Sequence, residues 1–464
     1  TEQETPAAKQ ADPATAEKSP KPEIDQPSDF DLKNEDIGKG GLTKKYKDNI
    51  AAIRILKAMD AEGRVATPEE RKAIARYVGW GALKGVFDKE NKQWSKEYAE
   101  LKDLLTDAEY KAARASTLNA HYTSPTVVGG IFKALEQLGF TTGRVLEPSV
   151  GTGNFFGLMP AAMRKKSQLH GVELDPLTSQ IAAALYPSAK IAKATGFQDF
   201  QVPAEYFDLA IGNPPFGSEP IVDNDRSPYS GASIHNYFFA KSIDKLRPGG
   251  LLAMVVSHNF MDANNEATRK WIADRADLVS AVRLPRTAFK ENAGTDVVTD
   301  ILVFRKRGAD DAAGDMSWVK TGKQTLNDPK SGNDVEHRVS SYFLNNPDKV
   351  LGTPSAAGSM YRAAEYTVEP SGDLEKQLTD WASSLPQNMY KPIERTHEQE
   401  AADVSVPDGV KVGSYFVGED GKVLIRGQDV MGSRTATEWT APNAKAAERM
   451  KGMIGLRDAL REQM

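Results

Sequence analysis

The fold is set by residues 145–155, which read VLEPSVGTGNF. An apolar run typical of a strand leads into a tight turn with two glycines, and a helical pattern follows. Glycine allows a tight turn and a close approach of the backbone to a ligand, and α/β sheets bind ligands at the carboxyl ends of their strands. Taken alone, this turn is as compatible with a purely structural role as with a ligand site.

Short β-branched runs alternate with helical stretches on both sides of this turn. The strands that the pattern predicts span residues 144–147, 169–174, 190–194, 208–212, 251–257, 278–284 and 299–305. The alternation predicts an α/β fold, a doubly wound, Rossmann-like sheet of about seven strands over residues 118–307. The last run follows its predecessor without a convincing helix, which indicates an antiparallel pair near the edge of the sheet.

The segments outside this sheet have different compositions. Residues 1–41 hold few large apolar side chains to offset the entropy of ordering, so we expect a disordered acidic tail. Residues 42–117 carry apolar residues at helical spacing, with a helix start at Thr67 and Pro68, and predict a helical N-terminal cap. Residues 308–464 hold short elements broken by Pro, Gly and Ser, and predict a C-terminal α+β domain.

Composition excludes several classes of protein. The 464 residues include no cysteine, which rules out disulfides and thiolate zinc sites, and the six histidines show no metal-ligand spacing. We find no apolar run of about 18 residues and therefore expect no membrane span. The absence of cysteine fits a cytoplasmic location, and we expect no bound metal. The net charge of −5 argues against binding nucleic acid by bulk charge, but leaves room for a local basic cleft.

Two acidic motifs follow the next two predicted strands. Glu173, within Gly171–Asp175, lies where nucleotide-binding α/β folds place an acid that accepts hydrogen bonds from ribose hydroxyls. Asp199 and Phe200 could hydrogen-bond an adenine amine and cover its ring. An ordinary acidic loop and a loop end with one buried Phe are the competing interpretations.

The most specific motif is Asn-Pro-Pro-Phe at residues 213–216, directly after the fourth predicted strand. Pro214 and Pro215 fix the backbone and aim its carbonyls. The Asn213 side-chain oxygen and the Pro214 carbonyl can then accept both hydrogens of a planar amine, while Phe216 stacks on the base. Such a site works by positioning and charge placement, without a covalent intermediate.

These residues together resemble the amino-methyltransferases with an Asn-Pro-Pro-aromatic signature. Residues 119–125, NAHYTSP, precede the glycine turn and resemble the cofactor-carboxylate motif of the gamma-class DNA adenine methyltransferases. That class places a target recognition domain last, in line with residues 308–464 here. With residues 77–83, YVGWGAL, the region from Arg71 to Arg307 is similar to methyltransferase modules of phage and mobile-element proteins, which are often joined to helicase domains.

The resemblance implies S-adenosylmethionine as cofactor and the N6 amine of adenine in double-stranded DNA as target, with the base flipped out of the helix. A homodimer on a palindromic site is an expectation by analogy. The residues implied for the cofactor are His121, Tyr122, Thr123, Glu147, Pro148, Gly151, Gly153, Asn154, Phe155, Glu173, Leu174, Asp199, Phe200 and Asn213.

Contacts with DNA are less specifically indicated. The polar loop Ser218–His235 could close over a duplex, and a solvated loop is an equal alternative. Arg226, Arg283 and Arg286 are candidates for phosphate contacts. Two other functions stay open at this point: methylation of RNA or of protein glutamine, and a catalytically silent DNA-binding module of a larger assembly.

Overall fold

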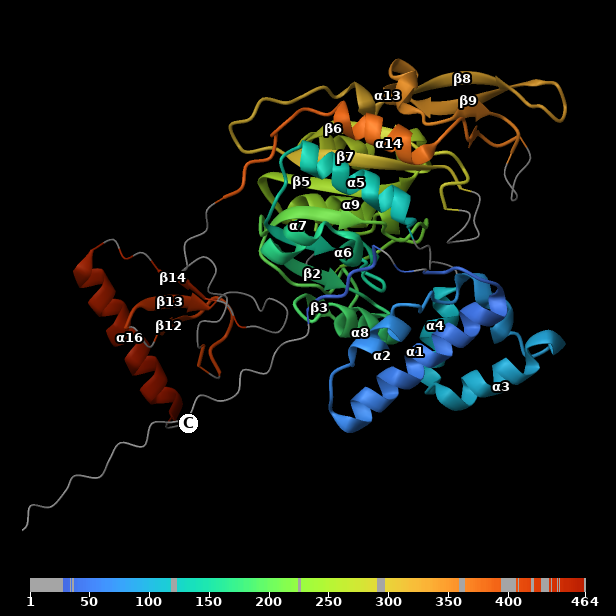
Figure 1. Ribbon diagram of the computed structural model, residues 1–464. Coiled ribbons are helices and arrows are strands. Elements are labelled where there is room, and N and C mark those ends of the chain that lie inside the picture. Colours follow the sequence, from blue (N-terminus) through green and yellow to red (C-terminus); the bar gives the residue numbers. More distant parts are fainter. Residues whose placement is uncertain are drawn as a thin grey trace, which may run out of the picture.

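A seven-stranded sheet forms the centre of the molecule (Figure 1). The computed structural model describes residues 28–462, with gaps at 34, 36, 118–122, 224–226, 290–296, 359–363 and 394–405 and short gaps at 408, 419–420, 427–433, 435, 440 and 442. The strands are β1 (Arg144–Glu147), β2 (Gln168–Val172), β3 (Lys190–Ala192), β4 (Phe207–Gly212), β5 (Leu246–Ser257), β6 (Ala276–Arg283) and β7 (Thr299–Lys306).

The strand order is β3-β2-β1-β4-β5-β7-β6. Strands β1 to β5 pair in parallel, while β7 runs antiparallel to both β5 and β6. All seven predicted strands are confirmed, with ends that differ by a few residues. The predicted antiparallel pair is also confirmed, and its partner β6 forms the edge. The α/β methyltransferase-like sheet expected from the sequence is therefore present.

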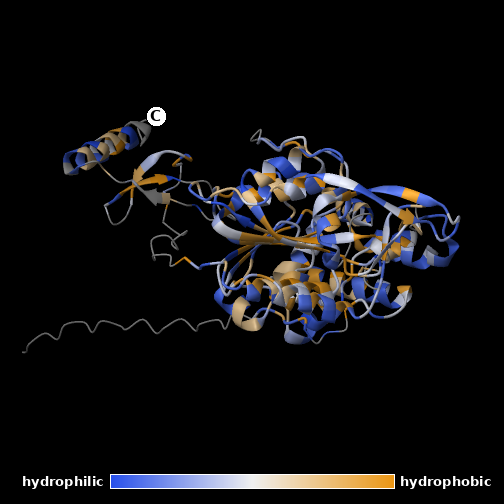
Figure 2. Cartoon of the chain, turned by 90° about the horizontal axis from the view of Figure 1, so that it is seen from above, coloured by the Kyte–Doolittle hydropathy of each residue, from blue (hydrophilic) through white to orange (hydrophobic). Residues whose placement is uncertain are grey.

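Alternate residues of the strands face two separate apolar cores. Val145 and Leu209 belong to one core, and their neighbours Leu146 and Ala210 belong to the other, as the two-residue period of a strand requires. Figure 2 shows the apolar strands of the sheet between the two layers. The first core is covered by α5 (Pro125–Gln137), α6 (Asn154–Leu158), α7 (Ala161–Lys166), α8 (Pro176–Leu185) and α14 (Leu374–Ser383); the second by α9 (Ile234–Lys245), α10 (Asn259–Asp262) and α11 (Ala267–Ala273).

The predicted cap is helical and packs against α8, at the β3 end of the sheet (Figure 1). Its helices are α1 (Leu42–Glu62), α2 (Pro68–Ile74), α3 (Ser95–Leu104) and α4 (Asp107–Ser116), with 3₁₀ segments at Gly81–Phe87 and Lys92–Trp94. Of these, α1, α2 and α4 contact α8. The predicted helix start at Thr67 is confirmed. Its hydroxyl accepts from the Glu70 N–H and the Glu70 carboxylate accepts from the Thr67 N–H, which forms a capping box.

Part of the predicted disordered tail is ordered. In residues 28–33, Leu32 is buried and the backbone N–H groups of Phe30 and Leu32 donate to the carbonyls of Leu185 and Gly157. The expectation for residues 1–41 is therefore wrong for this short segment. Its few apolar side chains suffice because they pack against a preformed surface, which composition alone cannot reveal.

The chain after β7 forms two kinds of structure. Helix α14 packs on α5, and the Trp381 indole N–H donates to Ser280 Oγ of β6 at 3.0 Å, so this segment shares the first core. The hairpin of β8 (Thr321–Asn327) and β9 (Asp334–Ser340) projects at the other end of the molecule from the cap (Figure 1). Other elements are a 3₁₀ turn at Ser317–Val319, α13 (Ser341–Asn345), a 3₁₀ turn at Pro347–Lys349, β10 (Thr353–Ser355), β11 (Thr367–Glu369), β12 (Tyr415–Val417), β13 (Val423–Arg426), β14 (Ala436–Glu438) and α16 (Ala444–Glu462).

Candidate active site

The glycine turn after β1 is held against the end of β2. Gly151 and Gly153 have φ values of +55° and +84°, which side chains other than glycine rarely adopt. The Gly151 N–H donates to Glu173 Oε2 at 2.9 Å, and the Val150 N–H donates to the Val172 carbonyl at 2.9 Å. At Gly153 a Cβ atom would lie 2.2 Å from Cε2 of Tyr186, so this close approach also requires glycine.

Two buried carboxyl groups line this turn. Burial, and then the nearby charge of Glu173, raise the pKa of Glu147 well above its ordinary value. Burial also raises the pKa of Glu173 to about 7, although the N–H groups of Asp175 and Gly151 oppose this by donating to its carboxylate. Two acids that repel each other in a dry site need a partner that donates hydrogen bonds or carries positive charge.

The Glu147 carboxylate shows where such a partner would bind. Its Oε2 is buried and has no hydrogen-bond partner within the described residues. An unsatisfied buried oxygen of this kind is costly unless a ligand supplies the donor. S-adenosylmethionine carries an ammonium group and two ribose hydroxyls, so the donor set of the cofactor fits the two acids of the turn.

The Asn-Pro-Pro-Phe turn lies beside the glycine turn. Strand β4 pairs with β1, with Val145 opposite Leu209, so the two strands end at the same edge of the sheet. The Ser149 hydroxyl donates to the Asn213 carbonyl at 3.5 Å. A Cβ atom on Gly212 would lie 3.4 Å from Cγ of Glu147. Phe216 is half-buried at the rim of the first core. The structure thus brings the two motifs into contact.

The other predicted cofactor residues have different surroundings. Leu174 stands next to Glu173 with 68% of its side chain exposed, which leaves an apolar surface open at the site. Pro148, Thr123 and Phe155 are buried, and Asn154 is half-buried with its Oδ1 accepting from the Thr152 hydroxyl. His121 and Tyr122 lie outside the described residues.

The two residues of the Asp199–Phe200 motif lie in different environments. Asp199 is exposed and its carboxylate accepts from the Gln198 side chain at 2.9 Å. Phe200 lies in the second core, stacked on Phe197 with 6.2 Å between ring centroids. Their role toward adenine stays a prediction.

Sequence reasoning missed the side chain that fixes this loop. The buried ammonium of Lys241, on α9, donates to the carbonyls of Phe197 at 2.6 Å and Gln198 at 3.2 Å. It thereby holds the backbone that leads to Asp199. The available signal was a lysine inside the apolar helical run YFFAKSI, residues 237–243, where a charged group needs a specific partner.

Two of the basic residues considered for phosphate contacts have structural partners. Arg283 is fully buried between Asp262 and Asp300, with contacts of 3.0 and 2.8 Å, so the hypothesis that it contacts DNA is wrong. The position of Arg283 in the sequence places it near the catalytic edge, but it does not show that the side chain points into the protein. Arg286 pairs with Glu369 at 2.9 Å, and Arg226 lies outside the described residues.

The loop after the catalytic turn is tied down at its base. Pro220 and Ser233 form an antiparallel bridge, and the Asp223 carboxylate accepts from the Ser227 N–H and the Tyr237 hydroxyl. His235 Nδ1 lies 2.8 Å from the Gly217 carbonyl, and burial lowers the pKa of this histidine. The beginning of the loop is therefore preorganised next to Phe216.

The described residues offer neither a metal site nor a membrane span. No three His, Cys, Asp or Glu side chains gather to hold a metal ion in the part of the chain that the structure describes. Within the same part, none of the helices combines the length and the apolar character that crossing a bilayer demands.

Comparison with known families gives a match for the central part of the chain. Residues 69–289 match the model of the Eco57I restriction-modification methylase family. Over this segment the chain is similar to the Eco57I-like methylases. The match spans the glycine turn, both acids and the Asn-Pro-Pro-Phe turn, and it supports a methyltransferase of the restriction-modification type. It also agrees with S-adenosylmethionine as the methyl donor, which the sequence predicted.

Individual relatives match the methylase segment in part. The chain is 26% identical over 277 residues to "Defense against restriction protein B" of Escherichia phage P1, covering 59% of this chain and 11% of that protein. It is 32% identical over 184 residues to the Type II methyltransferase M.CvrRI of Paramecium bursaria Chlorella virus XZ-6E, covering 37% and 45%. The chain thus spans less than half of either relative.

A solved structure with similarity is the type I restriction-modification methyltransferase subunit from Streptococcus thermophilus. The two structures superpose with a TM-score of 0.37 at 15% sequence identity, and the alignment covers 64% of this chain and 78% of that chain.

Proposed function

We propose that this protein is a site-specific DNA methyltransferase that transfers a methyl group from S-adenosylmethionine to the N6 amine of an adenine flipped out of double-stranded DNA. The observation that carries the proposal is the contact between the two turns, in which the Ser149 hydroxyl donates to the Asn213 carbonyl and Glu147 lies close to Gly212. A cofactor beside Glu147 and an amine beside Asn213 would be immediate neighbours. The family match supports a methylase of the restriction-modification kind.

The residues of the catalytic turn act by positioning. The adenine amine donates one hydrogen to the Asn213 side-chain oxygen and the other to the Pro214 carbonyl, which directs its nitrogen lone pair toward the cofactor. S-adenosylmethionine supplies an electrophilic methyl group on a sulfonium. With the cofactor bound, the N–C bond would form as the sulfur–methyl bond breaks to leave a neutral thioether, and the two oxygens would stabilise the positive charge on the amine nitrogen until it loses a proton to solvent. Phe216 stacks on the base and holds its plane.

Flipping the base costs a few kcal/mol of stacking and pairing, so the duplex has to be held elsewhere. The hairpin β8–β9 suits this role. Its outward side chains include Lys323, Thr325 and Arg338, with Lys323 directly opposite Arg338 across the strands. A two-stranded ribbon fits the major groove of B-DNA, and such polar side chains can read base edges.

The hairpin is also anchored near the catalytic edge. The Ser340 N–H, at the end of β9, donates to Asp262 Oδ1 at 2.7 Å, and Asp262 follows β5 closely and pairs with the buried Arg283. The cap packs at the opposite end of the sheet, against α8 (Figure 1). We therefore infer that the duplex lies across the carboxyl ends of the strands, between these two elements.

The experiment is nucleoside mass spectrometry after incubation of the full chain with S-adenosylmethionine and unmethylated duplex DNA. We expect N6-methyladenine from the wild type and none from Asn213→Ala, with cofactor binding retained by both. Asn259→Ala is the matched control, because Asn259 is an exposed asparagine that follows β5 at the same edge of the sheet. If the wild type binds the cofactor but leaves DNA unmarked, the DNA proposal fails, and RNA and protein glutamine are tested next.

A further inference from the structure

Residues 28–33, called the strap below, cross the ends of two helices that surround the glycine turn. The Phe30 N–H donates to the Leu185 carbonyl at 2.9 Å, and the Leu32 N–H donates to the Gly157 carbonyl at 3.0 Å. These carbonyls lie in the last turns of α8 and α6, where a helix lacks its own donors. The strap therefore supplies a donor to one carbonyl at each of these helix ends.

Two acidic side chains anchor the strap. The Asp29 carboxylate accepts from the Ser188 N–H and hydroxyl at 3.1 and 2.5 Å. Asp31 pairs with Arg164 at 3.1 Å. The Arg164 side chain is almost fully buried and also donates to the carbonyls of Phe156 and Gly157, the end of α6. One guanidinium thus joins the strap to the helix that follows the glycine turn.

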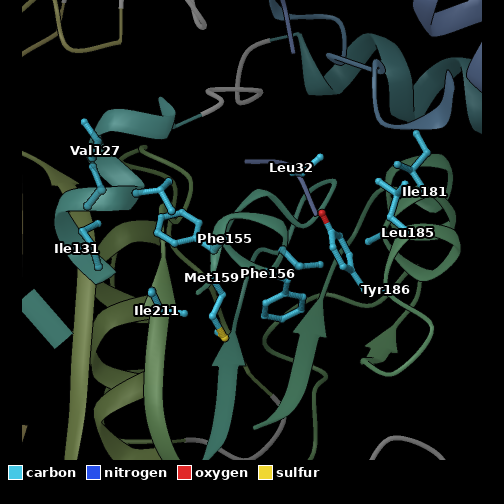
Figure 3. Packing of buried hydrophobic residues seen from close by; sticks show 14 of the residues in the cluster. Leu32, Val127, Ile131, Phe155, Phe156, Met159, Ile181, Leu185, Tyr186 and Ile211 are labelled. Atoms are coloured by element: carbon cyan, nitrogen blue, oxygen red, sulfur yellow. The ribbon is translucent and has the colours of Figure 1, made fainter. Parts of the chain in front are cut away.

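A continuous line of packed atoms leads from the strap to the turn. Leu32 is buried, and a Cβ atom on Gly157 would lie 2.4 Å from its Cγ and 2.3 Å from the Tyr186 hydroxyl. The ring of Tyr186 in turn touches Gly153, where a Cβ would lie 2.2 Å from Cε2. Figure 3 shows Leu32 beside the hydroxyl end of Tyr186, with Phe156 next to the ring.

Helix α6 depends on such support. It has only five residues, Asn154–Leu158, and a helix this short is not stable without tertiary packing. Gly153, a residue of the cofactor turn, is its N-cap. Displacement of Leu32 would open a space between Gly157 and Tyr186, and the ring of Tyr186 would no longer be pressed against Gly153.

We propose that the strap holds the glycine turn in its binding conformation, and that Leu32 is a positioning residue for S-adenosylmethionine. This inference rests on the assignment of the glycine turn to that cofactor. The strap contacts α6, α7 and the end of α8, so we expect it to act through Tyr186 and α6. Its removal should therefore change cofactor affinity more than it changes the chemistry at Asn213.

The first test compares Leu32→Ala with Leu56→Ala in the full chain. Both side chains are 3% exposed, but Leu56 lies on α1 of the cap. We expect similar losses of melting temperature. The dissociation constant of S-adenosylmethionine, measured by calorimetry, should rise about tenfold in Leu32→Ala only, because a turn that is ordered a tenth of the time binds ten times more weakly. Leu32→Met should restore most of the affinity.

Hydrogen exchange gives a readout without catalysis. The amides of residues 151–157 should exchange faster in Leu32→Ala than in Leu56→Ala. The proposal is overturned if the two variants bind S-adenosylmethionine with the same affinity, whether or not that affinity is lower than that of the wild type. If Leu32→Ala does not fold, the comparison is repeated with two N-terminal deletions, one that removes residues 1–27 and one that removes residues 1–33. Weaker binding is expected only from the second, which lacks the strap. A wild type that binds no S-adenosylmethionine would instead refute the cofactor assignment, so the two failures are distinguishable.

Discussion

Replacing Glu147 with Gln should make the cofactor-free protein more stable at neutral pH and its cofactor binding weaker. The carboxyl of Glu147 is buried, lies near Glu173 and has one oxygen without a partner in the described structure. Glutamine has the same shape and no charge. The variant therefore separates the electrostatic effect of the Glu147 carboxyl on stability from the effect of its packing. We expect the substitution to raise stability but to lower the affinity for the cofactor.

The stability effect follows from the raised pKa of Glu147. The unfolded chain loses this proton near pH 4.5, whereas the folded protein keeps it to a higher pH. The wild type therefore loses stability as pH rises above 4.5, by up to about 1.4 kcal/mol for each pH unit until the folded pKa is reached. Glu147→Gln lacks this loss, so the gap between the two proteins should widen from pH 5 to pH 7 in urea unfolding.

The binding effect has the opposite sign. A hydrogen bond to a charged group contributes about 1.5–3 kcal/mol, so its loss should raise the dissociation constant of S-adenosylmethionine roughly tenfold to a hundredfold. Calorimetry at pH 7.5 measures this, with Glu136→Gln as the control at an exposed glutamate of α5. A variant that binds the cofactor as tightly as the wild type, or whose stability gap is constant with pH, would refute the reasoning.

Three further predictions concern other parts of the chain. Because the pKa of Glu173 is about 7 and ribose hydroxyls donate to its ionised form, cofactor affinity should fall about tenfold per pH unit below pH 7, while Glu173→Gln should show no such slope. Arg283→Met leaves two buried carboxylates without their cation and should cost about 3–5 kcal/mol of stability in urea unfolding, yet the salt dependence of DNA binding should not change. Arg338→Ala should reduce the slope of log affinity for DNA against log salt by about 1 in fluorescence titrations, with cofactor affinity as the invariant control; an unchanged slope would remove the hairpin from the proposed interface.

The sequence predicted the sheet and the location of the site because both rest on local signals. Strands such as β1 and β4 are short apolar runs that end at glycine or proline, and their period and boundaries can be read residue by residue. The two turns that meet at Ser149 and Asn213 could be expected to share an edge, since parallel strands end on the same side of a sheet.

The prediction was weakest where a side chain's role depends on distant partners. Arg283 looked like a surface cation, but it is buried because Asp262 and Asp300 converge on it from other elements. Lys241 was overlooked for the same reason: the carbonyls that it holds, those of Phe197 and Gln198, lie more than forty positions earlier in the chain.

The sequence alone determined the α/β class and the order of the strands along the chain, and it predicted the chemistry at Glu147, Glu173 and residues 213–216. Only the tertiary structure decided that residues 28–33 pack on the ends of α6 and α8 and that β7 is inserted between β5 and β6. The physical reason is that periodicity and turn chemistry act between neighbours in the chain. Burial and ion pairing instead depend on surfaces that exist only after the sheet and its helices have assembled.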